Sequence, residues 1–155
     1  MRRFTLFVIT SCSPIQWRYT CDFPGVITRN STVLVADDDV LVRNLINAVL
    51  IRSGYSVLLA SDGEEALELS RRYPGKIDLL LSDVTMPRMD GLTLADQIRQ
   101  ERPNTRALLI SGKLSSEIVT ANARFDFLHK PFVPDQLKAK MLQVLSRPAS
   151  AVEEI

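Results

Sequence analysis

The 155-residue chain has little of several residue types that would define a chemistry. It holds one histidine and two cysteines, so it lacks a histidine pair and a cysteine spacing typical of metal sites. No apolar run approaches the roughly 20 residues that a membrane-spanning helix needs, so no membrane partner is expected. A net charge of +1 lacks the basic excess of a typical nucleic-acid-binding domain. The composition is instead that of an ordinary globular domain.

The first residues differ from the rest of the chain. They contain Cys12 and Cys21, for which two free thiols in a reducing cytoplasm are favoured over a disulfide. Residues 4–9 are mostly apolar and follow two arginines, as in a signal peptide, but the stretch is short and no clean small-residue cleavage site comes after it. We interpret residues 1–31 as a poorly ordered extension and residues 147–155 as a flexible tail. The alternative is a translation start further along the chain, which mass spectrometry of the native N-terminus would decide.

From residue 32 onward, strand-like apolar runs alternate with segments of helical periodicity. Residues 32–36 are apolar and β-branched, as expected for a strand buried on both faces. Residues 40–50 have apolar side chains at helical spacing, and Gly54 would supply a left-handed cap. The same alternation predicts strands at 56–60, 78–82, 106–110 and 125–128, and helices at 64–72, 92–100, 117–122 and 134–145. This pattern favours an α/β fold whose parallel sheet is covered on both faces, because parallel strands need crossover connections.

Polar residues stand where four of the five predicted strands end. They are Asp37, Asp38 and Asp39, then Asp83, then Ser111, and finally Lys130. The carboxyl ends of parallel strands form the ligand-binding edge of such a sheet. Carboxylates that meet there repel one another unless a cation binds, and oxygen ligands favour Mg²⁺. A lysine opposite them would neutralise charge on a phosphoryl group, so the pattern predicts phosphoryl transfer to a carboxylate. Singly, each residue has an ordinary structural explanation, and Asp39 is expected to cap the following helix.

Four stretches of this sequence resemble the receiver domains of two-component response regulators. They are VLVADDD at 33–39, SDVTMPRMDG at 82–91, LISG at 109–112 and LHKPF at 128–132. The resemblance covers residues 32–146. It implies a flavodoxin-like, doubly wound sheet of five parallel strands in the order 2-1-3-4-5 with five helices. The chain is thus expected to be a single receiver domain, similar to the single-domain chemotaxis regulators.

The resemblance also implies how the chain works. Asp83 would accept a phosphoryl group from a sensor histidine kinase or a phosphotransfer protein. Lys130 would pair with that group, Ser111 would move toward it, and Phe127 would follow from outward to inward. The phosphorylated form would bind a downstream effector protein in the cytoplasm. Phosphotransfer to itself and autodephosphorylation would be its only catalysis.

The cofactor implied by the resemblance is Mg²⁺. Asp38 and Asp83 would bind it directly, Asp37 through water, and Thr85 through its main-chain carbonyl. Thr85 and Lys113 would border the path of a water that attacks the phosphoryl group, and would influence how long the group persists.

The sequence departs from the family pattern at three points. Phe127 stands where tyrosine is commoner, and Ala123 where glycine is typical. The segment 111–130 is about one helical turn short. The standard family dimer therefore cannot be carried over, and a phosphorylation-dependent homodimer stays open. His129 is expected to be a partly exposed bystander.

Three other functions compete with a receiver. A haloacid-dehalogenase-like phosphatase would use Asp37 as nucleophile, but Leu41 breaks its motif and no acidic pair follows Lys130. An interaction module without phosphorylation would lack an acceptor, a metal ligand or the lysine. A transcription factor is disfavoured because only about ten residues follow the last predicted helix, too few for a DNA-binding motif. The 15 basic and 17 acidic residues from residue 32 onward, a net charge of −2, also disfavour DNA. The output is therefore expected to lie in another protein, unless this chain is a fragment of a longer one.

Overall fold

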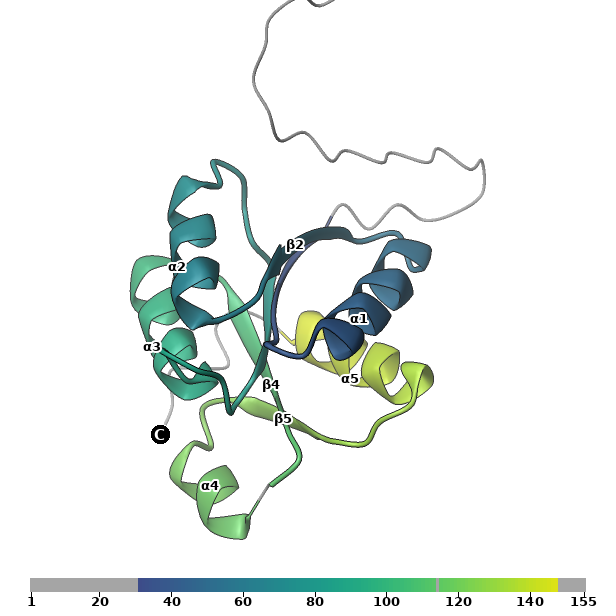
Figure 1. Cartoon of the computed structure of the whole chain (residues 1–155), viewed down its shortest axis with the longest axis vertical. Helices are drawn as coiled ribbons and strands as arrows, with labels where there is room; N and C mark the ends of the chain where they lie inside the picture. Colours follow the sequence, from purple (N-terminus) through teal and green to yellow (C-terminus); the bar gives the residue numbers. More distant parts are fainter. Residues whose placement is uncertain (1–30, 114, 148–155) are drawn as a thin grey trace, which may run out of the picture.

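The computed structural model describes residues 31–113 and 115–147, and shows one sheet with helices on both faces (Figure 1). Its strands are β1 (Thr32–Ala36), β2 (Ser56–Ala60), β3 (Leu79–Asp83), β4 (Arg106–Ser111) and β5 (Asp126–His129). Its helices are α1 (Val40–Arg52), α2 (Gly63–Arg72), α3 (Gly91–Glu101), α4 (Ser116–Ala121) and α5 (Pro134–Ser146). The predictions for residues 1–30 and 148–155, with Cys12 and Cys21, lie outside the described residues.

All five strands are parallel, in the order β2-β1-β3-β4-β5. This confirms the predicted doubly wound sheet. The order reverses between β1 and β3, since β1 leads to β2 on one side and the chain then crosses to β3 on the other. Helices α1 and α5 cover one face and α2 and α3 the other (Figure 1). A ligand site is therefore expected above the carboxyl ends of β1 and β3.

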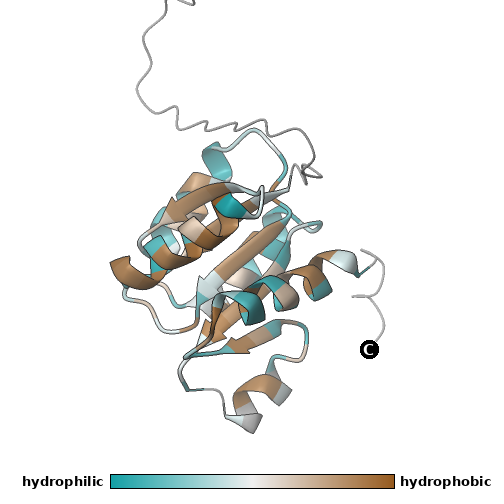
Figure 2. Ribbon diagram, turned by 90° about the vertical axis from the view of Figure 1, so that its right-hand side faces the viewer, coloured by the Kyte–Doolittle hydropathy of each residue, from teal (hydrophilic) through white to brown (hydrophobic). Residues whose placement is uncertain are grey.

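β1 shows why the strands are apolar without alternation. Val33 and Val35 belong to the core under α1 and α5, and Leu34 and Ala36 to the core under α2 and α3. Successive strand residues point to opposite faces, and both faces are covered here, so all four are fully buried. Figure 2 shows the mostly hydrophobic strands between helices that carry both hydrophobic and hydrophilic residues. Within residues 31–147, no helix has both the length and the apolar character needed to cross a membrane.

Three strands differ from prediction by one residue at one or both ends. β3 begins at Leu79, one residue later than predicted. The preceding Asp78 still contacts β1, since its carboxylate accepts a hydrogen bond from the Thr32 N–H at 2.9 Å and its own N–H donates to the Thr32 carbonyl at 2.9 Å. β3 then extends through Asp83, and β4 through Ser111. The backbones of these two site residues are thus part of the sheet ladder and not of the loops. β5 is also shifted by one residue, to Asp126–His129.

The predicted helix ends at α1 are confirmed. The Asp39 carboxylate accepts hydrogen bonds from the N–H groups of Leu41 at 2.8 Å and Val42 at 3.4 Å. Gly54 has φ of 83°, the left-handed conformation expected after the helix. At the other end of the domain, Arg147 follows α5 and pairs with Asp126 at 2.7 Å.

Candidate metal centre

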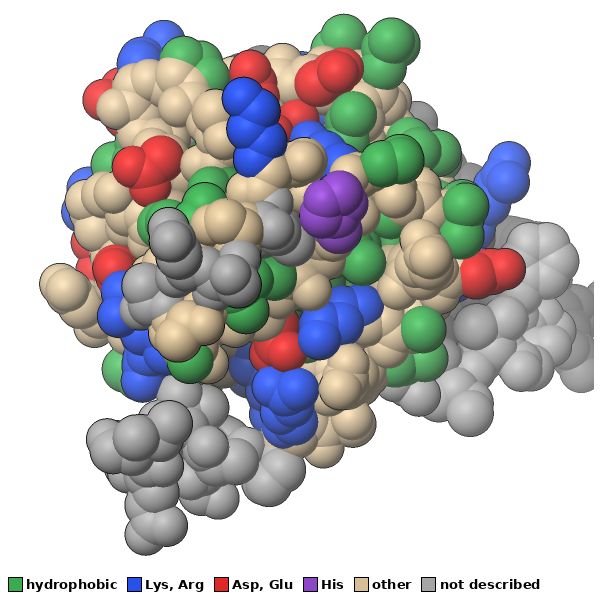
Figure 3. Space-filling view, turned by 90° about the horizontal axis from the view of Figure 1, so that it is seen from below, with side chains coloured by type: hydrophobic (Ala, Val, Ile, Leu, Met, Phe, Trp, Pro, Cys, Tyr) green, Lys and Arg blue, Asp and Glu red, His purple; other side chains and the backbone are tan. Residues whose placement is uncertain are grey.

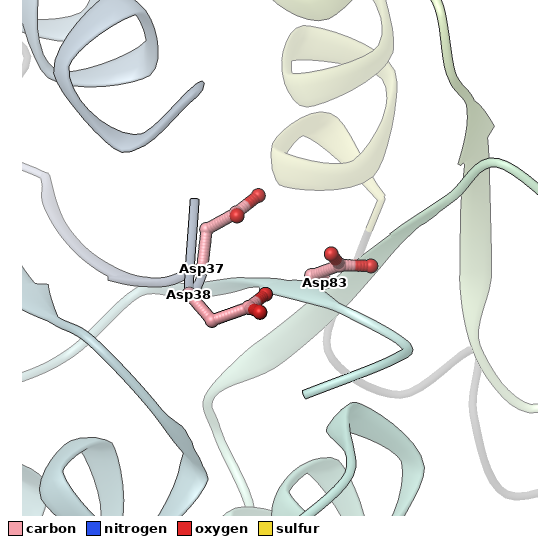
Figure 4. A group of neighbouring side chains, drawn as sticks. All are labelled: Asp37, Asp38 and Asp83. Atoms are coloured by element: carbon pink, nitrogen blue, oxygen red, sulfur yellow. The ribbon is translucent and has the colours of Figure 1, made fainter. Parts of the chain in front are cut away.

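Three carboxylates meet at the carboxyl edge of the sheet. Asp37 and Asp38 follow β1 and Asp83 ends β3, and one oxygen of each lies within 4.8 Å of the others (Figure 4). The side chain of Asp37 is 1% exposed and that of Asp83 is 13% exposed, whereas Asp38 is exposed. The cluster therefore has a buried floor and an open side. Like charges at this separation repel one another unless a cation compensates them.

Lys130 supplies one compensating charge. Its Nζ lies 3.0 Å from Asp37 Oδ2 and 3.0 Å from Asp83 Oδ2, so one ammonium group bridges two of the three carboxylates. The Lys130 N–H donates to the Ser111 carbonyl at 2.8 Å, which fixes the lysine backbone to the end of β4. Burial lowers the pKa of Lys130, but the hydrogen bonds to Asp83 and Asp37 outweigh this and the pKa is raised. The lysine is therefore fully charged at neutral pH.

Asp37 is the buried member of the cluster. Its Oδ1 accepts from the Asp39 N–H at 2.9 Å, and Arg43 donates to its main-chain carbonyl at 2.6 Å. Burial raises the pKa of Asp37, and the hydrogen bonds from Asp39 and Lys130 offset this only in part. A raised pKa in the folded protein means that ionised Asp37 opposes folding at neutral pH. A further cation at the cluster would relieve that cost.

The donor set fits Mg²⁺. All three candidate ligand atoms are carboxylate oxygens, and the open side at Asp38 leaves room for the waters that Mg²⁺ retains. After Lys130 has balanced one charge, the cluster still carries a net charge of −2, which suits a divalent cation.

We predict that Mg²⁺ stabilises the folded chain and that Asp38→Asn removes most of this effect. At a concentration about 100 times Kd, a cation that binds only the folded state adds about 2.7 kcal/mol. In EDTA the same variant should melt at a higher temperature than the native chain, because one repelling charge is gone. Thermal unfolding with and without Mg²⁺ measures both effects. Asp96→Asn is the control, since Asp96 pairs with Arg124 on the surface and should leave the response to Mg²⁺ unchanged. If Mg²⁺ does not change the melting temperature of the native chain, the prediction is wrong.

The other predicted site residues surround the cluster. The Thr85 N–H donates to Asp83 Oδ1 at 3.2 Å, and the threonine is exposed. Ser111 is 3% exposed and lies one strand from Asp83, and its hydroxyl accepts from the Lys113 N–H at 3.1 Å. Phe127 is half-buried against the core under α2 and α3. The structure thus gathers these residues at one edge of the sheet, and their roles in phosphotransfer stay predictions.

Sequence reasoning missed two residues beside the site. Asp62 comes two residues after β2, at the same edge of the sheet, and caps α2. Its side chain is 2% exposed and pairs with Arg88 of the loop between β3 and α3. The rule that identified the acids after β1 and β3 could have found Asp62. No local pattern marks Arg88 as its partner. His129 is exposed, in keeping with the predicted bystander.

The fold and the residues at the carboxyl edge of the sheet define a doubly wound α/β domain. Its acidic site and lysine lie where the strand order reverses. The response regulator receiver domain family matches residues 33–142, and the chain belongs to that family. The predicted resemblance is thereby confirmed. Among curated proteins, the chain is 35% identical over 124 residues to the sensor kinase CckA of Brucella abortus. It is 34% identical over 121 residues to PhoP, the alkaline phosphatase synthesis transcriptional regulatory protein of Bacillus subtilis.

These matches cover 78% and 76% of this chain, but only 13% of CckA and 50% of PhoP. Two solved structures are matched along nearly their whole length. Chemotaxis protein CheY4 of Vibrio cholerae has a TM-score of 0.68 and 30% identity, with 74% of this chain and 98% of that chain covered. The CheX–CheY–BeF₃–Mg²⁺ complex of Borrelia burgdorferi has a TM-score of 0.71 and 26% identity, with 76% and 90% covered.

Proposed function

We propose that Asp83 accepts a phosphoryl group from a sensor histidine kinase or a phosphotransfer protein in a Mg²⁺-dependent reaction. The observation that carries this proposal is the bridge from Lys130 to Asp83 and Asp37 beside the open carboxylate of Asp38. Asp83 is favoured over Asp37 as the acceptor because its side chain is 13% exposed, against 1% for Asp37. An attacking oxygen must reach a phosphoryl group on another molecule.

In the transfer, an oxygen of Asp83 forms a bond to phosphorus while the phosphorus–nitrogen bond of a phosphohistidine breaks. The imidazole nitrogen of the donor leaves with the electron pair. Lys130 holds the Asp83 carboxylate and meets the incoming phosphoryl oxygens with a positive charge. Asp38, Asp83, the Thr85 carbonyl and, through water, Asp37 would hold Mg²⁺, which when bound neutralises charge on the phosphoryl oxygens.

The product would act as a switch. Phosphorylation adds a charge of about −1.5 to −2 at Asp83. Ser111 would then turn its hydroxyl from the Lys113 N–H toward the phosphoryl group. The half-buried Phe127 would pack further inward, by apolar contact alone because it has no hydroxyl. Such a repacking changes the surface that an effector protein binds.

The ligands of one relative and the surface charge of this chain support parts of this proposal. The relative from Borrelia burgdorferi was solved with BeF₃ and Mg²⁺. On the face seen in Figure 3, acidic and basic side chains are interspersed, which does not favour direct binding of DNA. We place the chain in the cytoplasm, where nucleoside triphosphates feed a kinase donor, and assign it no catalysis beyond its own phosphorylation and autodephosphorylation. A homodimer, and an output carried by another protein, stay predictions.

Acetyl phosphate tests the proposal directly. We expect the native chain to gain one phosphoryl group in Mg²⁺ and none in EDTA, with the label on Asp83 by peptide mass spectrometry. Asp83→Asn should abolish labelling while the chain stays folded, because asparagine keeps the shape of the side chain and removes the nucleophile. Asp90→Asn is a matched control, since Asp90 caps α3 and lies outside the cluster. Label on Asp37 would instead indicate the phosphatase chemistry.

A further inference from the structure

The loop between β3 and α3, residues 84–90, carries the Thr85 carbonyl that the proposed function assigns to the metal. Both ends of this loop are fixed by the backbone: the Val84 N–H donates to Ile110 O at 2.8 Å, and the Gly91 N–H to Val84 O at 2.9 Å. Met86 anchors the middle of the loop in the core. The tip of the loop, at Arg88, needs a separate explanation.

Arg88 has φ of 66°, and it is the one residue other than glycine with a positive φ in the described part of the chain. Side chains with a Cβ disfavour this left-handed conformation. Such a conformation persists where surrounding contacts hold it.

The Arg88 guanidinium pairs with Asp62, and Glu64 Oε2 lies 3.8 Å from Arg88 Nε. The Asp62 side chain is only 2% exposed, and its other oxygen accepts from the Glu65 N–H at 2.9 Å as the cap of α2. A buried carboxylate is stable only when it is paired and hydrogen-bonded. Arg88 therefore supplies the charge that Asp62 needs, and Asp62 holds Arg88 in its left-handed conformation.

The neighbouring residues of the two loops are in close contact as well. Gly63, the first residue of α2, lies so near Met89 that an added Cβ would fall 2.7 Å from the Met89 carbonyl oxygen and 2.8 Å from its Cβ. The start of α2 and the tip of the loop between β3 and α3 thus pack as one unit. The ion pair of Arg88 with Asp62 closes this unit on its solvent side, since the Arg88 side chain is 60% exposed.

We propose that Arg88 is a positioning residue for the metal site. Its pair with Asp62 holds the loop between β3 and α3 in the conformation that presents the Thr85 carbonyl, so Mg²⁺ affinity depends on a side chain that touches no ligand. This inference rests on the proposed function of the acidic cluster as a Mg²⁺ site.

Isothermal titration of the 155-residue chain with Mg²⁺ alone tests the inference. Partners that orient metal ligands change affinity by about 10- to 100-fold, and Arg88 acts one step further away, so we expect Arg88→Ala to weaken Mg²⁺ binding by about five- to tenfold. Arg88→Lys should recover part of the loss, because it keeps the charge. Arg88→Gly should lose as much as Arg88→Ala, since it relieves the backbone conformation but lacks the ion pair. A glycine variant with native affinity would overturn the proposal.

Two further measurements separate positioning from general stability. Asp62→Asn keeps the cap of α2 and removes the charge, so it should weaken Mg²⁺ binding as Arg88→Ala does, and the double variant should lose no more than either. Amide hydrogen exchange of residues 84–90 should be faster in metal-free Arg88→Ala. Arg71→Ala is the matched control. Arg71 lies near the end of α2 and pairs with Glu101 at the end of α3, so its replacement should not change Mg²⁺ affinity.

The two proposals fail differently. If the native chain binds Mg²⁺ and Arg88→Ala binds it equally well, the positioning role is wrong and the proposed function stands. If the native chain does not bind Mg²⁺ at millimolar concentration, the proposed metal site is wrong, and the positioning role of Arg88 is wrong as well.

Discussion

Replacing Lys130 with alanine should slow labelling of Asp83 by acetyl phosphate by about a hundredfold or more. The loss of one preorganised positive group from a site of charge transfer has an effect of about 10²- to 10³-fold. Lys130 is such a group, because its Nζ lies 3.0 Å from the acceptor carboxylate and its backbone is fixed to the end of β4. Single-turnover labelling followed by mass spectrometry measures the rate.

The effect should depend on the position of the charge and not on net charge. Lys138→Ala removes a lysine that pairs with Asp135 on the surface of α5, so it should label at the native rate. Lys130→Arg keeps the charge but replaces a compact ammonium with a planar fork, and should recover only part of the rate. Labelling of Lys130→Ala at the native rate would remove the electrostatic basis of the proposal.

The Lys130→Ala variant should also be less stable than the native chain in EDTA at neutral pH. Without the ammonium group, the pKa of buried Asp37 rises further, since burial already raises it. When a carboxyl has a higher pKa in the folded than in the unfolded protein, its protonated form favours folding. That contribution is fully present below the unfolded-state pKa and is lost as the pH rises through the folded-state pKa. The stability difference between the native chain and Lys130→Ala should therefore narrow in acid, as Asp37 becomes protonated. Urea unfolding over a range of pH measures this trend.

Gly91→Ala should destabilise the folded chain by about 3 kcal/mol or more, one of the largest effects expected for a single methyl group. An added Cβ at Gly91 would overlap the main-chain carbonyl oxygen of Asp83 and press on the Ser82 hydroxyl. A flexible side chain could turn away, but the Asp83 backbone is held in the ladder with β4. Either α3 moves away from the sheet or Asp83 leaves its position, so the variant should also label poorly with acetyl phosphate.

Gly112→Ala is the matched control for this substitution. Gly112 also lies beside the site, but in the described part of the chain no atom beyond its own chain neighbours lies within 4 Å of an added Cβ. Its unfolding free energy should change by no more than about 0.5 kcal/mol. Urea unfolding of both variants provides the comparison. Equal midpoints for the native chain and Gly91→Ala would show that the helix can shift at little cost.

The fold was largely predictable because each element carries a local signal. Strand β1 is apolar without alternation, which indicates burial on both faces, and Asp39 and Gly54 mark the ends of α1. The partner of Asp78 was not predictable, because its carboxylate accepts a hydrogen bond from the Thr32 N–H, 46 residues away in the chain. A contact of that range has no trace in the local pattern.

The sequence by itself determined which side chains reach the carboxyl edge of the sheet. Alternating strands and helices place the carboxyl ends of all the parallel strands at one edge, and the resemblance to receiver domains implied the strand order that brings the ends of β1 and β3 together. Only the tertiary structure decided how they differ: Asp37 is buried and Asp38 is exposed, although they are adjacent in the chain. The tertiary structure alone also revealed that Arg88 pairs with Asp62 and that Gly91 lies against the Asp83 backbone. Burial and pairing depend on groups brought together by strand order, and these are invisible to local periodicity.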